Sequence, residues 1–354
     1  MPFSGGDILF ERRGAAGIVT LNRPKALNAV THGMVRALRA EIDRWASDPA
    51  ITRVVIMAAG ERAFSAGGDI RALYDLGKAG RADDALQFWR DEYPLNVAIK
   101  SYRKPFVALI DGIAMGGGVG VSVHGSHRVA GDRFSFAMPE VGIGFFPDVG
   151  ATWFLPRMPE ELGAYCALTG ERFGAADAVS SGIATHRIAS AQFDAVLDGL
   201  TGTVSVDAVL AAFAQPVDDG PIAQRKAAIY RLFAADRVDG ILDALDQEGR
   251  STSADAEWAR KTAATIRTKS PLSLKIALAQ IRRGKNWDFE TCMRTEFRIV
   301  SRIIKGHDFY EGVRAVIVDK DNTPRWRPAT LANVDDADVE RHFAPLGEVE
   351  LVLP

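Results

Sequence analysis

The stretch MGGGVG at residues 115–120 has an upstream counterpart in AFSAGGDI at residues 63–70. Each stretch follows a short apolar run typical of a buried strand and precedes a segment with helical character. Glycine leaves the backbone N–H unshielded, so that a ligand oxygen can approach it closely. N–H groups at the start of a helix also favour negative charge. The two stretches therefore predict two strand-to-helix junctions that bind one developing negative charge.

Gly68 and Gly117 are the candidates for an oxyanion hole, in which two backbone N–H groups point at one position. Such a hole stabilises the charge that an acyl carbonyl gains when it is attacked. The stretch MPEVGIGFFPDVG at residues 138–150 then supplies two carboxylates, Glu140 and Asp148. One can act as base or nucleophile and the other as its acid partner. The combination indicates acyl chemistry, with a thioester as the expected substrate.

Strand and helix signals alternate along the first half of the chain. Strands are predicted at residues 8–12, 16–21, 53–58 and 105–110, which are rich in apolar and β-branched residues. Apolar residues spaced near 3.6 predict an amphipathic helix at residues 31–46, and AFSAGGD is expected to be a loop. This order indicates an α/β fold of repeated ββα units.

The pattern changes in the second half. We expect residues 1–195 to form the ββα core that carries the acyl site, and residues 196–354 to form a helical region that completes it. Segments 205–248 and 255–306 show helical periodicity with few strand signals. The acidic segment 335–340 is expected to be a solvated helix.

Composition narrows the function classes. The chain has 354 residues, 47% hydrophobic and 25% charged, with a net charge of −2. A near-neutral chain has no global basic field for nucleic acid or anionic lipid, so neither partner is expected. Positive charge for an anionic substrate must then be local, and Arg23 and Lys25 in LNRPKALN are the candidates.

Cysteine and histidine give no sign of a disulfide or a metal. Cys166 and Cys292 are far apart, and Cys166 is expected to be a buried thiol. The six histidines lack metal-ligand spacing, and His124 is expected to be structural. The amino terminus shows neither a signal core nor an amphipathic presequence, and no apolar run reaches membrane-spanning length. The expected location is therefore the cytoplasm.

Four segments resemble the crotonase (enoyl-CoA hydratase/isomerase) superfamily and, within it, the 3-hydroxyisobutyryl-CoA hydrolase branch. They are AFSAGGDIRAL (63–73), DGIAMGGGVGVSVHG (111–125), FAMPEVGIGFFPDVGATWFLPRM (136–158) and GHDFYEGVRAVIVDKDNTPRW (306–326). The resemblance implies a crotonase-like spiral of ββα units with a helical carboxy-terminal region, and acyl-CoA binding. It also implies that the protein is a homo-oligomer of the trimer type.

The carboxylates separate the branches of this superfamily. Hydratases carry acids at the positions of Gly120 and Glu140, and this chain keeps only Glu140. Asp148 and Glu92 resemble instead the acidic set of the hydrolase branch. The resemblance thus implies hydrolysis of 3-hydroxyisobutyryl-CoA, a thioesterase step of valine catabolism. Three alternatives stay open: an enoyl-CoA hydratase or isomerase, a hydrolase of another short 3-hydroxyacyl-CoA, and a non-catalytic acyl-CoA-binding protein.

The expected site can be stated residue by residue. The catalytic set is Glu140, Asp148, Gly68 and Gly117. The substrate-binding set is Glu92, Gly117, Glu140, Asp148, Ala66, Lys25, Ala26, Asp69 and Ile70. No metal and no cofactor are expected, because coenzyme A arrives as part of the substrate. Glu140 as nucleophile and Glu140 as general base are both open.

Several of these residues also have ordinary structural interpretations. Asp69 would cap the helix that starts at Ile70, and Asp148 after Pro147 could make a turn or a cap. Glu92 on a helix would usually be solvated. Only the joint arrangement favours the catalytic interpretation.

Overall fold

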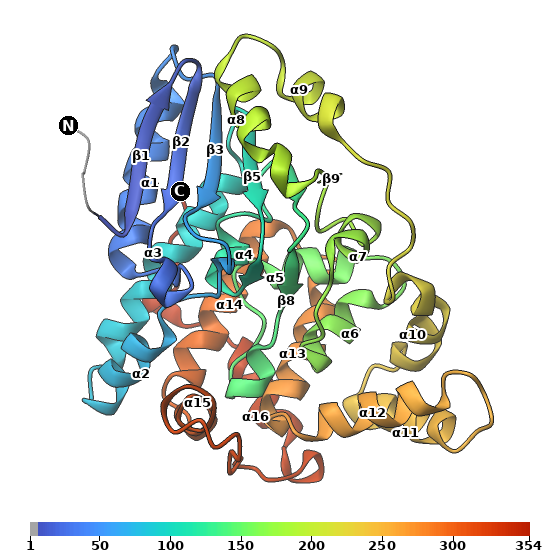
Figure 1. Ribbon diagram of the computed structural model, residues 1–354. Coiled ribbons are helices and arrows are strands. Elements are labelled where there is room, and N and C mark those ends of the chain that lie inside the picture. The colour runs from blue at the N-terminus through green and yellow to red at the C-terminus, as the bar shows by residue number, and fades with distance from the viewer. Residues whose placement is uncertain (1–5) are drawn as a thin grey trace.

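The computed structural model describes residues 6–354. In this part of the chain the strands form a six-stranded sheet, in the order β1-β2-β3-β5-β7-β9, and a three-stranded sheet, β4-β6-β8 (Figure 1). The strands are β1 (Ile8–Arg13), β2 (Ala16–Leu21), β3 (Arg53–Ala58), β4 (Ala63–Ser65), β5 (Phe106–Ile110), β6 (Ile113–Met115), β7 (His127–Ala130), β8 (Ser135–Ala137) and β9 (His186–Arg187).

The helices surround these sheets and continue beyond them. They are α1 (His32–Ser47), α2 (Ile70–Lys78), α3 (Ala82–Lys100), α4 (Gly117–Gly120), α5 (Ala151–Phe154), α6 (Leu162–Thr169), α7 (Ala175–Ser180), α8 (Phe193–Thr201), α9 (Val206–Phe213), α10 (Lys226–Phe233), α11 (Val238–Gly249), α12 (Ala256–Arg267), α13 (Pro271–Gly284), α14 (Phe289–Ile303), α15 (His307–Val313) and α16 (Asp336–Phe343). In the described chain no helix is both long and apolar enough to cross a membrane.

From β3 to β8, consecutive strands belong alternately to the large and the small sheet, and this alternation produces the spiral. In each of the pairs β3–β4, β5–β6 and β7–β8, the first strand joins the large sheet and the second joins the small one. Among the strands of residues 6–354, β1 and β2 pair antiparallel, and the other neighbouring strands pair in parallel. Strands β3 and β5 are apolar on both faces and buried, as expected for parallel strands covered by helices. The expected α/β fold of ββα units is confirmed.

Both faces of the large sheet are covered. Val107 and Leu109 of β5 and Val129 of β7 pack against Val196 and Leu200 of α8 in one apolar cluster. Figure 1 shows α8 and α9 beside these strands. A much larger cluster on the other face contains the side chains of α1, α3, α13 and α14. The cavity described below lies on the side of this larger cluster.

The segment AFSAGGD is not wholly a loop, because its first residues form β4. Ala63 pairs with Ile113 of β6, in parallel. A strand of three residues is too short to show an alternating pattern, and its partner lies far along the chain. After β4 and β6 the chain turns at Gly67 (φ +119°) and Gly116 (φ +45°) into α2 and α4. Both glycine stretches thus lie at strand-to-helix junctions.

Candidate active site

A cavity of about 690 Å³ lies between the two glycine turns and the carboxy-terminal region. The turn residues Gly67, Gly68, Gly116 and Gly117 form one part of its wall. The side chains of Glu92, Glu140 and Asp148 also line it. The structure therefore brings the two predicted turns and the three predicted carboxylates to one cavity.

The two glycine turns lie against each other. A Cβ atom placed on Gly117 would be 3.2 Å from the Gly68 nitrogen and 2.8 Å from Oε1 of Glu92. Gly117 is the first residue of α4, so its N–H has no acceptor within the helix. A side chain at this position would fill the space next to both N–H groups, which explains why the turn needs glycine.

Glu140 begins a 3₁₀ turn, residues Glu140–Ile143, and reaches the glycine turn at residues 115–118. A Cβ atom on Gly116 would be 3.5 Å from its Oε1. Its Oε2 is buried and has no hydrogen-bond partner within residues 6–354. Burial raises the pKa of Glu140 well above its usual range, and the negative charge of Asp148 adds to this. A carboxylate with a raised proton affinity and a free oxygen in a cavity is suited to accept a proton from a substrate or water.

Asp148 is 5% exposed and accepts a hydrogen bond from the hydroxyl of Tyr93, over 3.0 Å. Burial raises the pKa of Asp148 to about 7, and the bond from Tyr93 opposes this shift. Glu92 is 1% exposed on α3, so the solvated interpretation is wrong. Its pKa is raised by burial and by the charges of Asp148 and Glu296. Burial and mutual repulsion thus both favour the protonated forms of these carboxyl groups, whose titrations depend on one another.

An apolar wall surrounds these carboxylates. Trp89 stacks on Phe145 with ring centroids 5.6 Å apart, and Phe88 packs edge-on against Trp89. All three rings line the cavity. Their low polarity is the physical source of the desolvation that raises the carboxylate pKa values.

The remaining predicted residues divide into two groups. Ala26, Ala66, Asp69 and Ile70 line the cavity, and Lys25 is not among the lining residues. Asp69 also caps α2, because its Oδ1 accepts the N–H of Ala72 at 3.3 Å. The structural interpretation of Asp69 is thus confirmed.

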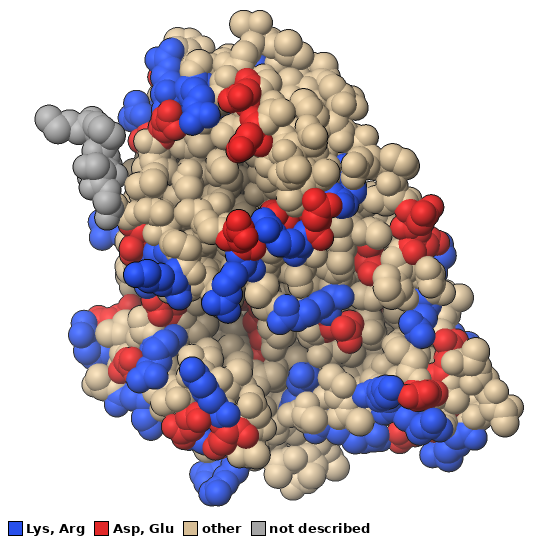
Figure 2. Space-filling model, viewed as in Figure 1, with Lys and Arg blue, Asp and Glu red and all other residues tan. Residues whose placement is uncertain are grey.

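Arg23 and Lys25, the predicted sources of local positive charge, do not line the cavity. Arg23 is held by ion pairs with Asp69 and Asp7, at 3.2 and 3.4 Å. Lys269 instead lines the cavity, and burial lowers the pKa of its ammonium. Arg71 also lines the cavity and pairs with Asp75. Figure 2 shows blue and red side chains mixed over the visible face, without a continuous patch of one sign.

The carboxy-terminal wall of the cavity is formed by Val316, Ile317 and Asn322. Val316 and Ile317 belong to a π-helical turn, Arg314–Val318, that continues α15. The segment 319–323, which contains Asn322, then folds back over this turn. No periodicity in the sequence indicates that these residues contribute to the site, although they lie in one of the four segments that carry the family resemblance.

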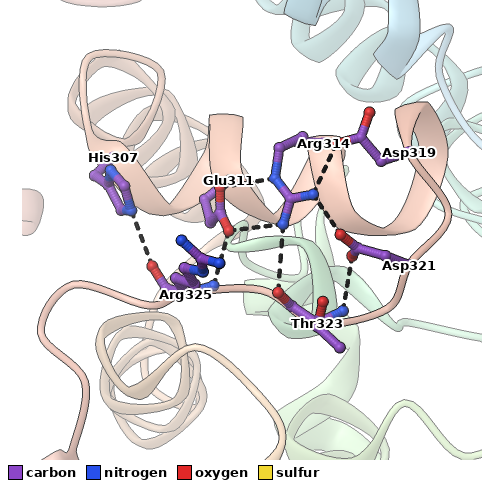
Figure 3. A network of polar contacts seen from close by, with 7 residues as sticks. All are labelled: His307, Glu311, Arg314, Asp319, Asp321, Thr323 and Arg325. Atoms are coloured by element: carbon purple, nitrogen blue, oxygen red, sulfur yellow. Dashed lines mark hydrogen bonds and ion pairs between the residues drawn. The ribbon is translucent and has the colours of Figure 1, made fainter.

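Arg314 holds this wall together (Figure 3). Its guanidinium donates to both oxygens of Glu311, to Asp319 at 2.8 Å and to Asp321 at 2.6 Å. It also donates to the backbone oxygen of Thr323 at 3.3 Å. Its bonds to Glu311, Asp319 and Asp321 raise the pKa of Arg314, so it stays charged. One arginine therefore fixes both ends of segment 319–323.

Comparison with known proteins places the chain in a family. The family model described as enoyl-CoA hydratase/isomerase matches residues 16–343. A curated relative from Danio rerio, "3-hydroxyisobutyryl-CoA hydrolase, mitochondrial", is 43% identical over 362 residues, which cover 99% of this chain and 92% of the relative. A relative of the same name from Xenopus tropicalis is 44% identical, with 98% and 91% covered.

These names correct the expected cytoplasmic location. The expectation depended on the lack of a presequence pattern at the amino terminus, whereas the curated relatives are named mitochondrial proteins. A targeting segment is separate from the folded domain and is removed from the mature protein. The pattern of the first residues was therefore insufficient to assign the compartment.

A solved structure is similar over almost the whole chain. The carnitinyl-CoA dehydratase from Mycobacterium thermoresistibile superposes with a TM-score of 0.92 at 43% identity and covers 98% of this chain and 99% of its own. The spiral of paired strands, the two glycine turns and the family match agree. The chain belongs to the enoyl-CoA hydratase/isomerase family and, within it, to the 3-hydroxyisobutyryl-CoA hydrolase branch.

Proposed function

We propose that the protein is a thioester hydrolase that converts 3-hydroxyisobutyryl-CoA and water into 3-hydroxyisobutyrate and CoA. The observation that carries this proposal is the pairing of Glu140 and Asp148 beside the N–H groups of Gly68 and Gly117 in one cavity. The names of the curated relatives support the choice of acyl group.

The reaction is assigned to these residues as follows. The thioester oxygen binds to the N–H groups of Gly68 and Gly117, which stabilise the charge that develops on it. Glu140 takes a proton from water, the water oxygen attacks the carbonyl carbon, and the C–S bond breaks. The sulfur leaves as a thiolate and is protonated to CoA. In the second route Glu140 attacks the carbonyl itself, and water then hydrolyses the mixed anhydride.

Asp148 and Glu92 are assigned to the acyl end of the substrate. Glu92 Oε1 is buried without a hydrogen-bond partner in the described chain, next to the glycine turn. An unpaired buried oxygen is costly unless a ligand donates to it. The 3-hydroxyl of the acyl group is such a donor, and Asp148, whose charge acts on Glu92, can orient it or a water molecule.

The carboxy-terminal region, residues 196–354, completes the site in this proposal, because Lys269, Val316, Ile317 and Asn322 line the cavity. Lys269 supplies positive charge for the phosphates of CoA. The reaction needs no metal and no further cofactor. A homo-oligomer of the trimer type is part of the same proposal.

A hydratase or dehydratase is the second candidate, since the similar solved structure has a dehydratase name. The surroundings of Gly120 argue against it. A Cβ atom there would be 2.9 Å from both Asn96 Nδ2 and Val149 Cβ. There is thus no room for the second acid that hydratases carry at this position, and water activation for addition to a double bond is incomplete.

Two parallel assays separate the candidates. Release of free thiol is measured with 3-hydroxyisobutyryl-CoA, 3-hydroxypropionyl-CoA and crotonyl-CoA, and loss of the enoyl absorbance is measured with crotonyl-CoA. We expect fast thiol release from a 3-hydroxyacyl-CoA and little change in the enoyl absorbance. Rapid hydration of crotonyl-CoA with an intact thioester would replace the proposal with the second candidate. No thiol from any substrate, and no hydration, would favour a binding protein.

A further inference from the structure

The backbone directly after Asp148 has an unusual conformation. Val149 has φ +53° and Gly150 has φ +89°, so that two consecutive residues are left-handed. For a β-branched residue such as valine this region is unfavourable, and it persists only where the surroundings enforce it. The direction of the Asp148 side chain depends on this turn. Something in the surrounding structure must therefore hold it.

Glu296 on α14, which does not line the cavity, makes two contacts with the turn. Its Oε2 accepts the N–H of Gly150 at 2.7 Å, and its Oε1 accepts the N–H of Thr152 at 2.9 Å. The side chain is 0% exposed. Both carboxylate oxygens are thus used by backbone groups of one turn, in a place that water does not reach.

Two further contacts limit how the turn can move. Nε2 of His124 lies 2.6 Å from the backbone oxygen of Val149, and Gln280 Nε2 donates to the oxygen of Pro147 at 2.6 Å. These contacts fix carbonyl groups. Within residues 6–354, the carboxylate of Glu296 is the acceptor of the N–H groups of Gly150 and Thr152. A neutral amide has one oxygen and one NH₂ group, so its two ends cannot both accept a hydrogen bond.

The charged state of Glu296 is coupled to the site. Burial raises its pKa to about 8, the N–H of Gly150 lowers it, and the charge of Asp148 raises it. The other titratable groups that interact with it electrostatically are Glu92, Tyr93 and Cys292. Glu296 does not line the cavity, so its influence on the reaction passes through the turn and through these charges.

We infer that Glu296 is a positioning residue, which holds the left-handed turn Val149–Gly150 and thereby places the Asp148 carboxylate in the cavity. The inference rests on the proposed role of Asp148 in thioester hydrolysis. It assigns a part in the reaction to α14, a helix of the carboxy-terminal region that contributes no residue to the cavity wall.

The main test is Glu296→Gln, which keeps the size of the side chain and replaces one acceptor with a donor that opposes an N–H. We expect kcat to fall by at least about tenfold, since a small displacement of a catalytic group is costly. KM should stay within about twofold, because the part of the cavity that binds CoA is untouched. A kcat within twofold of the wild type would overturn the inference.

A double-variant cycle distinguishes positioning from general structural damage. If Glu296 acts through Asp148, then Glu296→Gln combined with Asp148→Asn should be no slower than Asp148→Asn alone. If the fold-losses in kcat of the two single variants multiply in the double variant, Glu296 acts independently of Asp148 and the inference is wrong. Asp177→Asn is the matched control: Asp177 is 3% exposed and accepts the N–H groups of Ile222 and Ala223, both at 3.0 Å, away from the cavity. It should lower stability and leave kcat unchanged.

One measurement needs no variant and therefore does not depend on whether Glu296→Gln folds. In the wild-type protein the amides of Gly150 and Thr152 should exchange slowly with solvent, because Glu296 accepts both in a buried place. Exchange as fast as in an exposed loop would contradict the inference. If exchange is slow but the wild-type protein hydrolyses none of the substrates, the contacts of the turn are supported and the proposed function is wrong.

Discussion

The hydroxyl of Tyr93 donates a hydrogen bond to Oδ2 of Asp148 over 3.0 Å, with both side chains buried. A donor of this kind favours the ionised carboxylate, whereas burial favours the protonated one. In this protein burial is the larger effect and raises the pKa of Asp148 to about 7, with Tyr93 opposing it. Tyr93 therefore keeps the pKa of Asp148 lower than burial alone would make it.

Tyr93→Phe tests this relationship. Without the hydroxyl, the pKa of Asp148 should rise further, so the change in activity that follows its titration should move to higher pH. We expect kcat at neutral pH to fall by about tenfold or more, the scale of one hydrogen bond to a charged group. Tyr102→Phe, which removes a hydroxyl that donates to Ile42 at 2.8 Å outside the cavity, is the control. An unchanged pH profile would show that Asp148 does not titrate in the reaction.

Glu140→Gln should remove the proton acceptor or nucleophile and keep the shape of the cavity. We expect turnover to fall by at least about 100-fold, the scale of a positioned general base, with a smaller change in KM. The measurement is steady-state thiol release with a 3-hydroxyacyl-CoA. The exposed Glu257→Gln is the control. Near-normal turnover in the Glu140 variant would remove this residue from the mechanism.

The pH dependence of activity should change in a defined direction in Asp148→Asn. The charge of Asp148 is one of the causes that raise the pKa of Glu140, after burial. When that charge is removed, Glu140 should lose its proton at lower pH, so the acid limb of kcat/KM should move to lower pH. The profile is measured on the residual activity of the variant. A limb that stays in place, or moves to higher pH, would show that another group controls it.

The free energy of unfolding should also depend on the titration of Asp148. Asp148 has a folded-state pKa raised to about 7, above the unfolded value near 3.8, so the folded protein holds more protons between these values. Its contribution to stability is complete at low pH and is lost as the pH rises through about 7. Relative to the wild type, Asp148→Asn should therefore gain unfolding free energy as the pH rises from about 3.8 to about 7. Denaturant unfolding of both proteins at several pH values measures this difference.

The predicted residues that the structure brings to the cavity are mostly those in local sequence patterns. Gly68 and Gly117 follow apolar runs and precede helices, so their N–H groups were placed from periodicity and glycine alone. Glu140 and Asp148 lie in one short glycine- and proline-rich stretch, and their grouping with Glu92 came from the family resemblance. The helix cap at Asp69 also needed only its neighbours.

The parts that were missed or wrong depend on tertiary packing. Glu296 is one acid among several in an amphipathic helix. Its role becomes visible only in the structure, where α14 packs against the turn after Asp148 and Glu296 accepts two backbone N–H groups of that turn. Lys269 reaches the cavity through the packing of the carboxy-terminal region, whereas Lys25, near in sequence to the first turn, does not line it. Burial of Glu92 could not be deduced from its helix, because the covering elements are distant in sequence.

Gly117→Ala tests the oxyanion hole. The new Cβ would lie 2.8 Å from Glu92 Oε1 and 3.2 Å from the Gly68 nitrogen, so it would fill the space where the thioester oxygen binds. The backbone N–H of residue 117 remains, but the oxygen can no longer reach it. We expect kcat/KM to fall by at least about 100-fold, the scale of stabilisation by one oxyanion donor. Gly174→Ala, where a Cβ meets nothing within 4 Å, controls for helix effects. A folded Gly117→Ala protein with normal hydrolysis would place the hole elsewhere.

The last prediction concerns the wall formed by Val316, Ile317 and Asn322. Arg314 neutralises Glu311, Asp319 and Asp321 and fixes both ends of the segment that carries Asn322 (Figure 3). Glu311 also accepts the N–H of Arg325, and His307 contacts the Arg325 carbonyl. In Arg314→Gln the three carboxylates lose their common partner and repel one another, so segment 319–323 should move away from the cavity.

Val316 in this wall is 39% exposed, so the wall is expected to contact the CoA part of the substrate rather than the reacting carbonyl. Arg314→Gln should therefore raise KM for the acyl-CoA about fivefold or more and leave kcat nearly unchanged, the pattern of lost uniform binding. With a short N-acetylcysteamine thioester, which lacks most of CoA, kcat/KM should match the wild type. Arg294→Gln, which breaks an exposed pair with Glu290, is the matched control. Equal losses with both thioesters would mean that Arg314 supports the reacting end of the cavity, and unchanged kinetics with both would mean that this wall does not bind substrate.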